Sequence, residues 1–163
     1  KIDIKKLSIE SLAQKAKVFL EKSDIEIKSE KWLELLVTVF QDRMTYIGEI
    51  TELYHAFFHQ EFKISSEAYD FLIENNSLIL LENFYSHLKA SDFQVEVIEA
   101  AIKQSGLDTE TKGKLLYMGL RIATTGDMHG PSLPASLALL GKEEVTKRLK
   151  NTIDKLRGEA WRK

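Results

Sequence analysis

The sequence of 163 residues contains no cysteine, so it can form no disulfide or thiolate metal site and offers no thiol nucleophile. Its only prolines are Pro131 and Pro134, and its glycines are isolated, which excludes the glycine-rich phosphate loops of nucleotide-binding folds. No apolar run approaches the ~20 residues of a membrane span, and the first ten residues hold no apolar signal core. We therefore expect a soluble, cytoplasmic chain without a membrane partner. Because it begins with Lys1, we expect a processed chain or a fragment.

Charge is nearly balanced, with a formal net charge of -2. That balance argues against indiscriminate nucleic-acid binding, and we expect no DNA partner. Residues 1–90 carry 11 basic and 15 acidic side chains, whereas residues 91–163 carry 12 basic and 10 acidic ones. The modest positive excess of the second half is compatible with contact to a few phosphates.

Apolar side chains recur at steps of three and four along almost the whole chain, which predicts an all-α fold of roughly nine helices. The expected helix starts are near Ile9, Ser29, Thr45, Ser66, Ser77, Ser91 (a capping box with Gln94), Asp108, Ser132 and Lys142. The expected ends include Gly106, Gly126, Gly141 and Arg157. Leu115 is expected among the apolar residues of the helix that ends at Gly126.

Two packed helical subdomains are expected, residues 1–64 and 65–163. The division falls where the aromatic run ending at Phe62 gives way to a lysine and two serines. Nothing there is rich in glycine or proline, so the division is not a flexible linker.

His55 and His59 are spaced four residues apart with Glu52 on the same side, a spacing compatible with a metal site on a helix. The flanking Phe57 and Phe58 favour an aromatic packing face instead, and we expect no metal. His129 is the histidine best placed for a ligand, although an exposed loop position is the simpler interpretation. No nucleophile with a dedicated base is visible, so we expect no catalytic residue and no cofactor.

Residues 118–149 contain four glycines and both prolines, and they read MGLRIATTGDMHGPSLPASLALLGKEEVTKRL. This segment resembles the closing pattern of the C-terminal, anticodon-binding region of bacterial glutamate-tRNA ligases, which are class I aminoacyl-tRNA synthetases. The matching positions are Leu120, Arg121, Ala123, Thr125, Gly126, Gly130, Pro131, Leu139, Leu140, Gly141, Lys142, Glu143, Arg148 and Leu149. Thr124 departs from the pattern, because the family usually carries Leu there. Residues 7–20 and 40–58 are similar to two further segments of the family.

The resemblance implies a class I synthetase anticodon-binding fold and a role in selecting tRNA through its anticodon loop. It implies that Arg43 reads the third anticodon base, that Arg121 and Leu133 approach the first two, and that Thr125, Gly126, Gly130 and Pro131 shape the pocket. The family's two ATP-binding signatures are missing, so this chain alone should catalyse nothing. The full-length ligase would use ATP and Mg to attach glutamate to tRNA, in the cytoplasm and as a monomer.

The chemistry of these residues leaves alternatives open. Cytosine presents the adjacent acceptors O2 and N3, which suit the two-donor fork of Arg43, whereas guanine presents N–H donors there. A surface ion pair with Glu49 or Asp42 is the competing interpretation of Arg43. Arg121 could instead serve the end of its helix, and Leu133 could be a core residue. The rival function is a helical protein-protein interaction module that binds no RNA. Whether tRNA for glutamine is also accepted depends on the loop geometry around Arg43.

Overall fold

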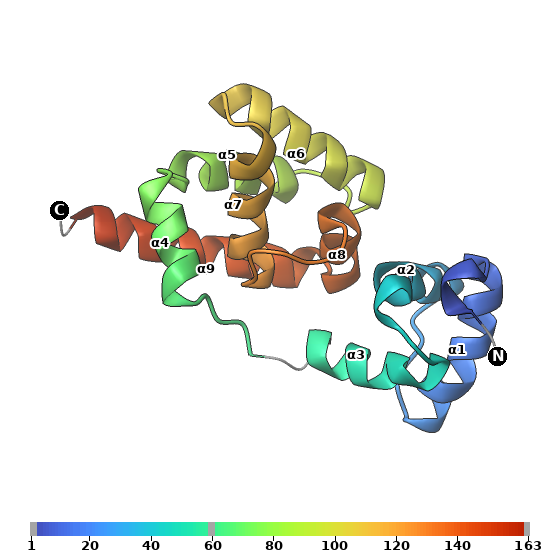
Figure 1. Ribbon diagram of the computed structural model, residues 1–163. Helices are drawn as coiled ribbons and strands as arrows, with labels where there is room; N and C mark the ends of the chain where they lie inside the picture. The colour runs from blue at the N-terminus through green and yellow to red at the C-terminus, as the bar shows by residue number, and fades with distance from the viewer. Residues whose placement is uncertain (1–2, 59–60, 162–163) are drawn as a thin grey trace. The chain divides into compact units, whose positions relative to one another are not determined.

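The computed structural model describes residues 3–58 and 61–161, and within these ranges it contains nine α-helices and no strand (Figure 1). The expected all-α class is confirmed. The chain forms two compact units, residues 1–61 and 62–163. The structural division therefore follows Glu61, whereas the sequence placed it after residue 64.

Unit 1 consists of α1 (Ile9–Lys22), α2 (Glu30–Phe40) and α3 (Ile50–Phe58), with short 3₁₀ turns at Ile4–Lys6, Gln41–Arg43 and Ile47–Glu49. Ser8 and Ser29 cap α1 and α2, because each hydroxyl accepts a hydrogen bond from an amide in the first turn of its helix. Apolar faces of the three helices meet in the unit's core, which includes Leu12, Ala16, Leu20, Leu33, Leu36 and Ile50.

The expected role of Thr45 as the cap of α3 is wrong. Its amide and hydroxyl both donate to the Glu49 carboxylate, at 2.9 and 3.1 Å, and a 3₁₀ turn precedes the α-helix, which begins at Ile50. Hydrogen bonds from Thr45, above all from its backbone, lower the pKa of Glu49. The Glu49 carboxylate, and not the Thr45 hydroxyl, is therefore the acceptor that organises this turn.

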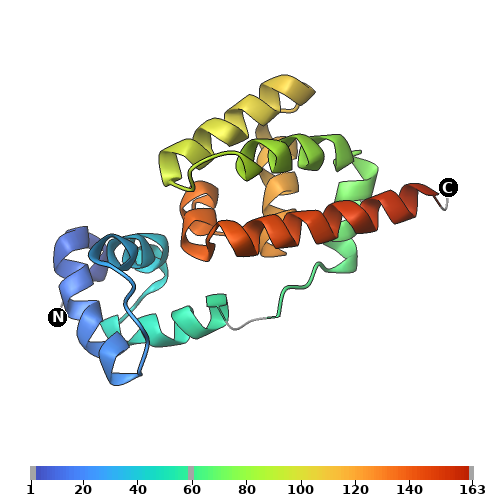
Figure 2. The ribbon, with the colours of Figure 1, turned by 180° about the vertical axis from the view of Figure 1, so that it is seen from behind.

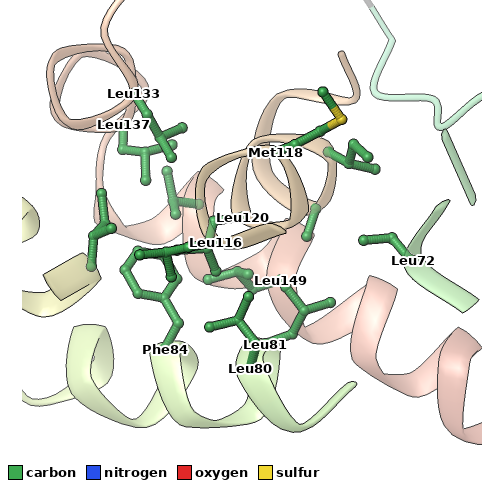
Figure 3. Close-up of a cluster of buried hydrophobic side chains, with 14 of the residues drawn as sticks. Leu72, Leu80, Leu81, Phe84, Leu116, Met118, Leu120, Leu133, Leu137 and Leu149 are labelled. Carbon is green, nitrogen blue, oxygen red and sulfur yellow. The ribbon is translucent and has the colours of Figure 1, made fainter. Parts of the chain in front are cut away.

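Unit 2 consists of α4 (Ser66–Glu74), α5 (Leu78–Lys89), α6 (Val95–Thr109), α7 (Gly113–Thr125), α8 (Leu133–Leu140) and α9 (Lys142–Trp161). Helix α7 packs against each of the other five, and α9 runs along α5, with α8 packed at the N-terminal end of α9 (Figure 2). Leu116 and Leu120 of α7 meet Leu81 and Phe84 of α5 and Leu149 of α9 in the core (Figure 3). Helix α7 is thus the central element of the unit.

Several expected helix boundaries in unit 2 are corrected. Ser65, not Ser66, caps α4, since its hydroxyl accepts from the Ala68 amide. Ser91 does not open α6: its hydroxyl donates to the Leu88 carbonyl, and the helix begins after Gln94. Helix α6 also continues through Gly106 to Thr109.

Gly106 and Asp108 have roles other than those expected. A Cβ on Gly106 would lie 2.7 Å from the Thr111 carbonyl oxygen and 2.9 Å from Cδ2 of Leu116, so the glycine permits close packing and does not end the helix. Asp108 lies within α6, where its carboxylate accepts hydrogen bonds from His87, Gln104 and Asn83, which lower its pKa. Lys112 occupies the cap position of α7.

Candidate functional site

The expected stop at the end of α7 is confirmed. Gly126 has φ of +83°, and its amide donates to the Ile122 carbonyl at 3.0 Å. A Cβ at this position would lie 2.4 Å from the carbonyl oxygen of Lys63. The Thr125 hydroxyl donates to the Arg121 carbonyl at 2.9 Å and accepts from the Asp127 amide at 3.3 Å. The turn is therefore fixed by the left-handed conformation of Gly126, by the close approach of the Lys63 carbonyl oxygen and by the hydrogen bonds of the Thr125 hydroxyl.

Arg121 ties the loop that follows this turn to α7. Its Nη1 donates to the carbonyl oxygen of Pro131 at 2.8 Å, which bridges ten positions of the chain. Just beyond, the Ser132 hydroxyl accepts from the Ala135 amide and caps α8, as expected, and Pro134 lies in the first turn of that helix. Both ends of the loop 127–131 are thus anchored.

A shallow hollow lies between α7 and this loop. It is lined by Lys114, Tyr117, Met118 and Arg121 from α7 and by Met128, His129 and Gly130 from the loop. The four helix residues follow the spacing of one helix face. Two lining side chains are basic, Lys114 and Arg121, and none is a carboxylate, so the hollow suits an anionic ligand.

The hollow brings Arg121 and Gly130 together, while Thr125, Gly126 and Pro131 hold the turn and loop around it. Sequence reasoning missed Lys114, Tyr117 and Met128. Their spacing relative to Arg121 could have placed Lys114 and Tyr117 on its face of the helix, but Met128 gives no periodic signal because it lies in a loop.

Leu133 belongs to the buried core of unit 2, where its side chain is 1% exposed and packs with Leu137 and its neighbours (Figure 3). Of the two interpretations of Leu133 given from the sequence, the one as a core residue matches its position. In this structure its side chain supports α8 from within and offers no accessible face to a ligand.

Arg148 supports the end of α7 from the side of α9. It is 8% exposed, and its Nη1 donates to the Thr124 carbonyl at 2.9 Å while Nε donates to Glu144 at 2.7 Å. The Phe62 ring lies 4.8 Å from the guanidinium carbon. The buried charge is thus paired and hydrogen-bonded, and it fixes the helical turn directly before Gly126. The sequence motif includes Arg148 in its final Arg-Leu pair, but it did not predict that this side chain supports the end of α7.

Arg43 lies in unit 1, in the 3₁₀ turn after α2, and its side chain is exposed. Within the described residues it has no hydrogen bond or ion pair, and the Glu49 carboxylate that could have paired with it contacts Thr45 instead. The surface ion pair considered for Arg43 is therefore not formed here.

The predicted aromatic face of α3 is present, with Tyr54 and Phe58 ring centroids 4.7 Å apart and Trp32 of α2 6.3 Å from each. His59 lies outside the described residues. Among those described, no three histidine, cysteine or acidic side chains gather as a metal site would require. Of the helices in the described ranges, none is long and apolar enough to cross a membrane.

The fold and the cationic hollow define a helical domain suited to an anionic ligand, and comparison with known proteins gives its family. The family model described as the anticodon binding domain matches residues 11–153. The chain belongs to this family of anticodon-binding domains.

Its relatives are glutamate-tRNA ligases. It is 42% identical over 157 residues to the glutamate-tRNA ligase of Acholeplasma laidlawii, covering 96% of this chain and 35% of that protein. It is 36% identical over 152 residues to the ligase of Latilactobacillus sakei, with 93% and 30% covered. The chain thus spans about a third of these relatives and matches their C-terminal part, without the catalytic part.

A crystal structure of a glutamate-tRNA ligase from Elizabethkingia meningosepticum has the same fold, with a TM-score of 0.74 and 22% sequence identity. The match covers 93% of this chain and 30% of that one.

Proposed function

We propose that this chain recognises the anticodon loop of tRNA as the C-terminal part of a glutamate-tRNA ligase, which attaches glutamate to its tRNA in protein biosynthesis. The observation that carries the proposal is the cationic hollow between α7 and the loop 127–131. Five of its seven lining residues fall in the segment 118–149 that resembles the ligases, and it belongs to a domain of the anticodon-binding family.

Anticodon bases are unpaired, so a protein can contact both their faces and their Watson-Crick edges. In this proposal Arg43 reads the third base through its exposed guanidinium. Arg121 lines the hollow for the first two bases and holds the loop in place, while Thr125, Gly126, Gly130 and Pro131 set the shape of the loop. Leu133 contributes by supporting α8, because its side chain is buried.

Binding at the anticodon is remote from the chemistry of charging. The full ligase uses such binding energy to orient the acceptor end of the tRNA, where ATP and Mg support the attachment of glutamate. This chain supplies recognition and no catalytic group. The whole enzyme is proposed to act as a cytoplasmic monomer, with tRNA and not DNA as its partner.

The test is the salt dependence of binding between the chain and a glutamate tRNA transcript. Phosphate contacts release counterions, so the logarithm of the affinity should fall linearly with the logarithm of salt concentration. A chain that binds no tRNA at low salt, yet captures a protein partner, would instead be the helical protein interaction module.

A further inference from the structure

Tyr117 is an aromatic residue on the outer face of α7. Its neighbours Leu116, Met118 and Leu120 are each at most 6% exposed, whereas Tyr117 is 37% exposed. The ring therefore contributes less to the core than its neighbours do. It borders the hollow that holds Arg121, and on its other side it borders a second depression beside Leu107 and Leu116.

On the side of Arg121, the Tyr117 ring is surrounded by both basic and apolar side chains. Lys114 precedes Tyr117 by one helical turn and Arg121 follows it by one, so the three side chains share a face of α7. Met128 and His129 of the loop complete the wall. An aromatic side chain between cations, with apolar methionine nearby and no carboxylate, matches a site that stacks a base and neutralises its phosphates.

A peptide would be recognised differently. A helix or strand docking here would need a continuous apolar strip, but Met118 is 6% exposed and Met128 is half-buried. The cations on both sides of Tyr117 would also repel a basic partner. The combination on this face favours an unpaired base attached to phosphates.

We propose that Tyr117 is the stacking platform for an unpaired base of the RNA loop, and that Lys114 neutralises a phosphate next to that base. This inference rests on the proposed function, since it takes the RNA as given and adds two contacts that determine its affinity. Stacking tolerates any base, so Tyr117 supplies affinity while sequence is read elsewhere.

The experiment uses the 163-residue chain and RNA hairpins with a glutamate anticodon loop, each carrying 2-aminopurine at one loop position. Stacking on an aromatic ring quenches this fluorophore. We expect quenching at one position with the unaltered chain and with Tyr117→Phe. Tyr117→Leu should abolish the quenching and weaken binding by about 5- to 100-fold.

Lys114→Gln tests the phosphate contact: it should reduce the slope of log affinity against log salt by about one phosphate contact. Two variants serve as controls. Lys150→Gln on α9 should leave that slope unchanged, and Leu107→Ala, which alters the depression on the other side of the ring, should leave binding and quenching unchanged. Circular dichroism melting of each variant confirms that it folds.

The outcomes separate the two proposals. If the unaltered chain does not bind the hairpins, the proposed function and this inference fall together. If it binds them, and Tyr117→Leu binds and quenches equally well, only the inference is overturned. Weak binding by both Tyr117→Phe and Tyr117→Leu would also overturn it, because the hydroxyl and not the ring would then be responsible.

Discussion

At the scale of the single residue, Arg121 both lines the proposed tRNA-binding hollow and holds the loop that borders it. Its hydrogen bond to the Pro131 carbonyl means that removing it both deletes a cation and releases the loop. A charge-assisted hydrogen bond in a partly desolvated site contributes roughly 1.5 to 3 kcal/mol. We therefore predict that Arg121→Ala weakens tRNA binding by at least tenfold in a filter-binding titration.

Arg157→Ala is the matched control for that substitution. Arg157 is an exposed arginine on α9 that pairs with Glu82 and lies outside the hollow. Its removal should change tRNA affinity by less than twofold. Equal losses in the two variants would remove Arg121 from the binding site.

Arg43 carries the prediction about base specificity. Glutamine offers one donor and one acceptor and can turn to suit either edge, so Arg43→Gln should lower discrimination between C and G at the third anticodon base. By analogy with base readout in duplexes, the change should be ~1 to 3 kcal/mol, or roughly ten- to a hundred-fold. Competition binding with two tRNAs that differ only at that base measures it.

Two results would contradict the assignment to Arg43. If the unaltered chain already treats C and G alike, Arg43 is an exposed cation of the turn after α2 and reads no base. If the glutamine variant keeps the full preference for C, another residue reads the base.

At the scale of the element, the end of α7 depends on Gly126. Valine there would combine a left-handed backbone conformation with a Cβ placed 2.4 Å from the Lys63 carbonyl oxygen. We predict that Gly126→Val destabilises the chain by several kcal/mol, measured by urea unfolding, with a larger loss than Gly126→Ala. An unchanged unfolding midpoint would show that the turn tolerates a side chain, and the inferred loop geometry would fall with it.

Two helical glycines give an opposite pair of predictions. A Cβ added at Gly158 of α9 would meet no atom within 4 Å, so Gly158→Ala should stabilise the helix by about 0.5 to 1 kcal/mol. A Cβ added at Gly106 of α6 would lie against the Thr111 carbonyl and Leu116, so Gly106→Ala should destabilise the chain. Thermal melting of both variants checks this, and stabilisation by Gly106→Ala would contradict the packing role.

These elements also show which features the sequence can predict. Helical periodicity predicted the all-α class, and local chemistry predicted the caps at Ser29 and Ser132 and the stop at Gly126, because the residues involved lie within a few positions of each other. Gly106 was misjudged as a stop. Its need for a glycine arises above all from the Thr111 carbonyl oxygen, 2.7 Å from the Cβ position, and then from Leu116 of α7. This close approach depends on how the chain turns after α6, which apolar periodicity does not record.

The candidate site follows the same rule. Arg121 was proposed from the motif, but its bond to the Pro131 carbonyl and its proximity to Tyr117 and Met128 depend on how the loop folds back on α7. Leu115, expected among the apolar residues of this helix, is 44% exposed.

At the scale of the whole molecule, recognition is assigned to one end of the tRNA. The chain spans about a third of the length of its relatives, and in the proposed function it is a binding domain remote from the catalytic part. In the proposed function both units contact the same tRNA, through Arg43 in unit 1 and through the hollow in unit 2. The chain should therefore bind the anticodon arm of the tRNA and should not bind the acceptor arm.

The most direct measurement is competition between two halves of a glutamate tRNA for this chain. Labelled full-length tRNA is displaced either by the hairpin of the anticodon arm or by a minihelix of the acceptor arm. We predict that the anticodon hairpin displaces the tRNA at a concentration within about tenfold of that of unlabelled full-length tRNA, which corresponds to ~1.4 kcal/mol, and that the acceptor minihelix does not displace it. Displacement by the acceptor minihelix at equal or lower concentration would contradict the central claim.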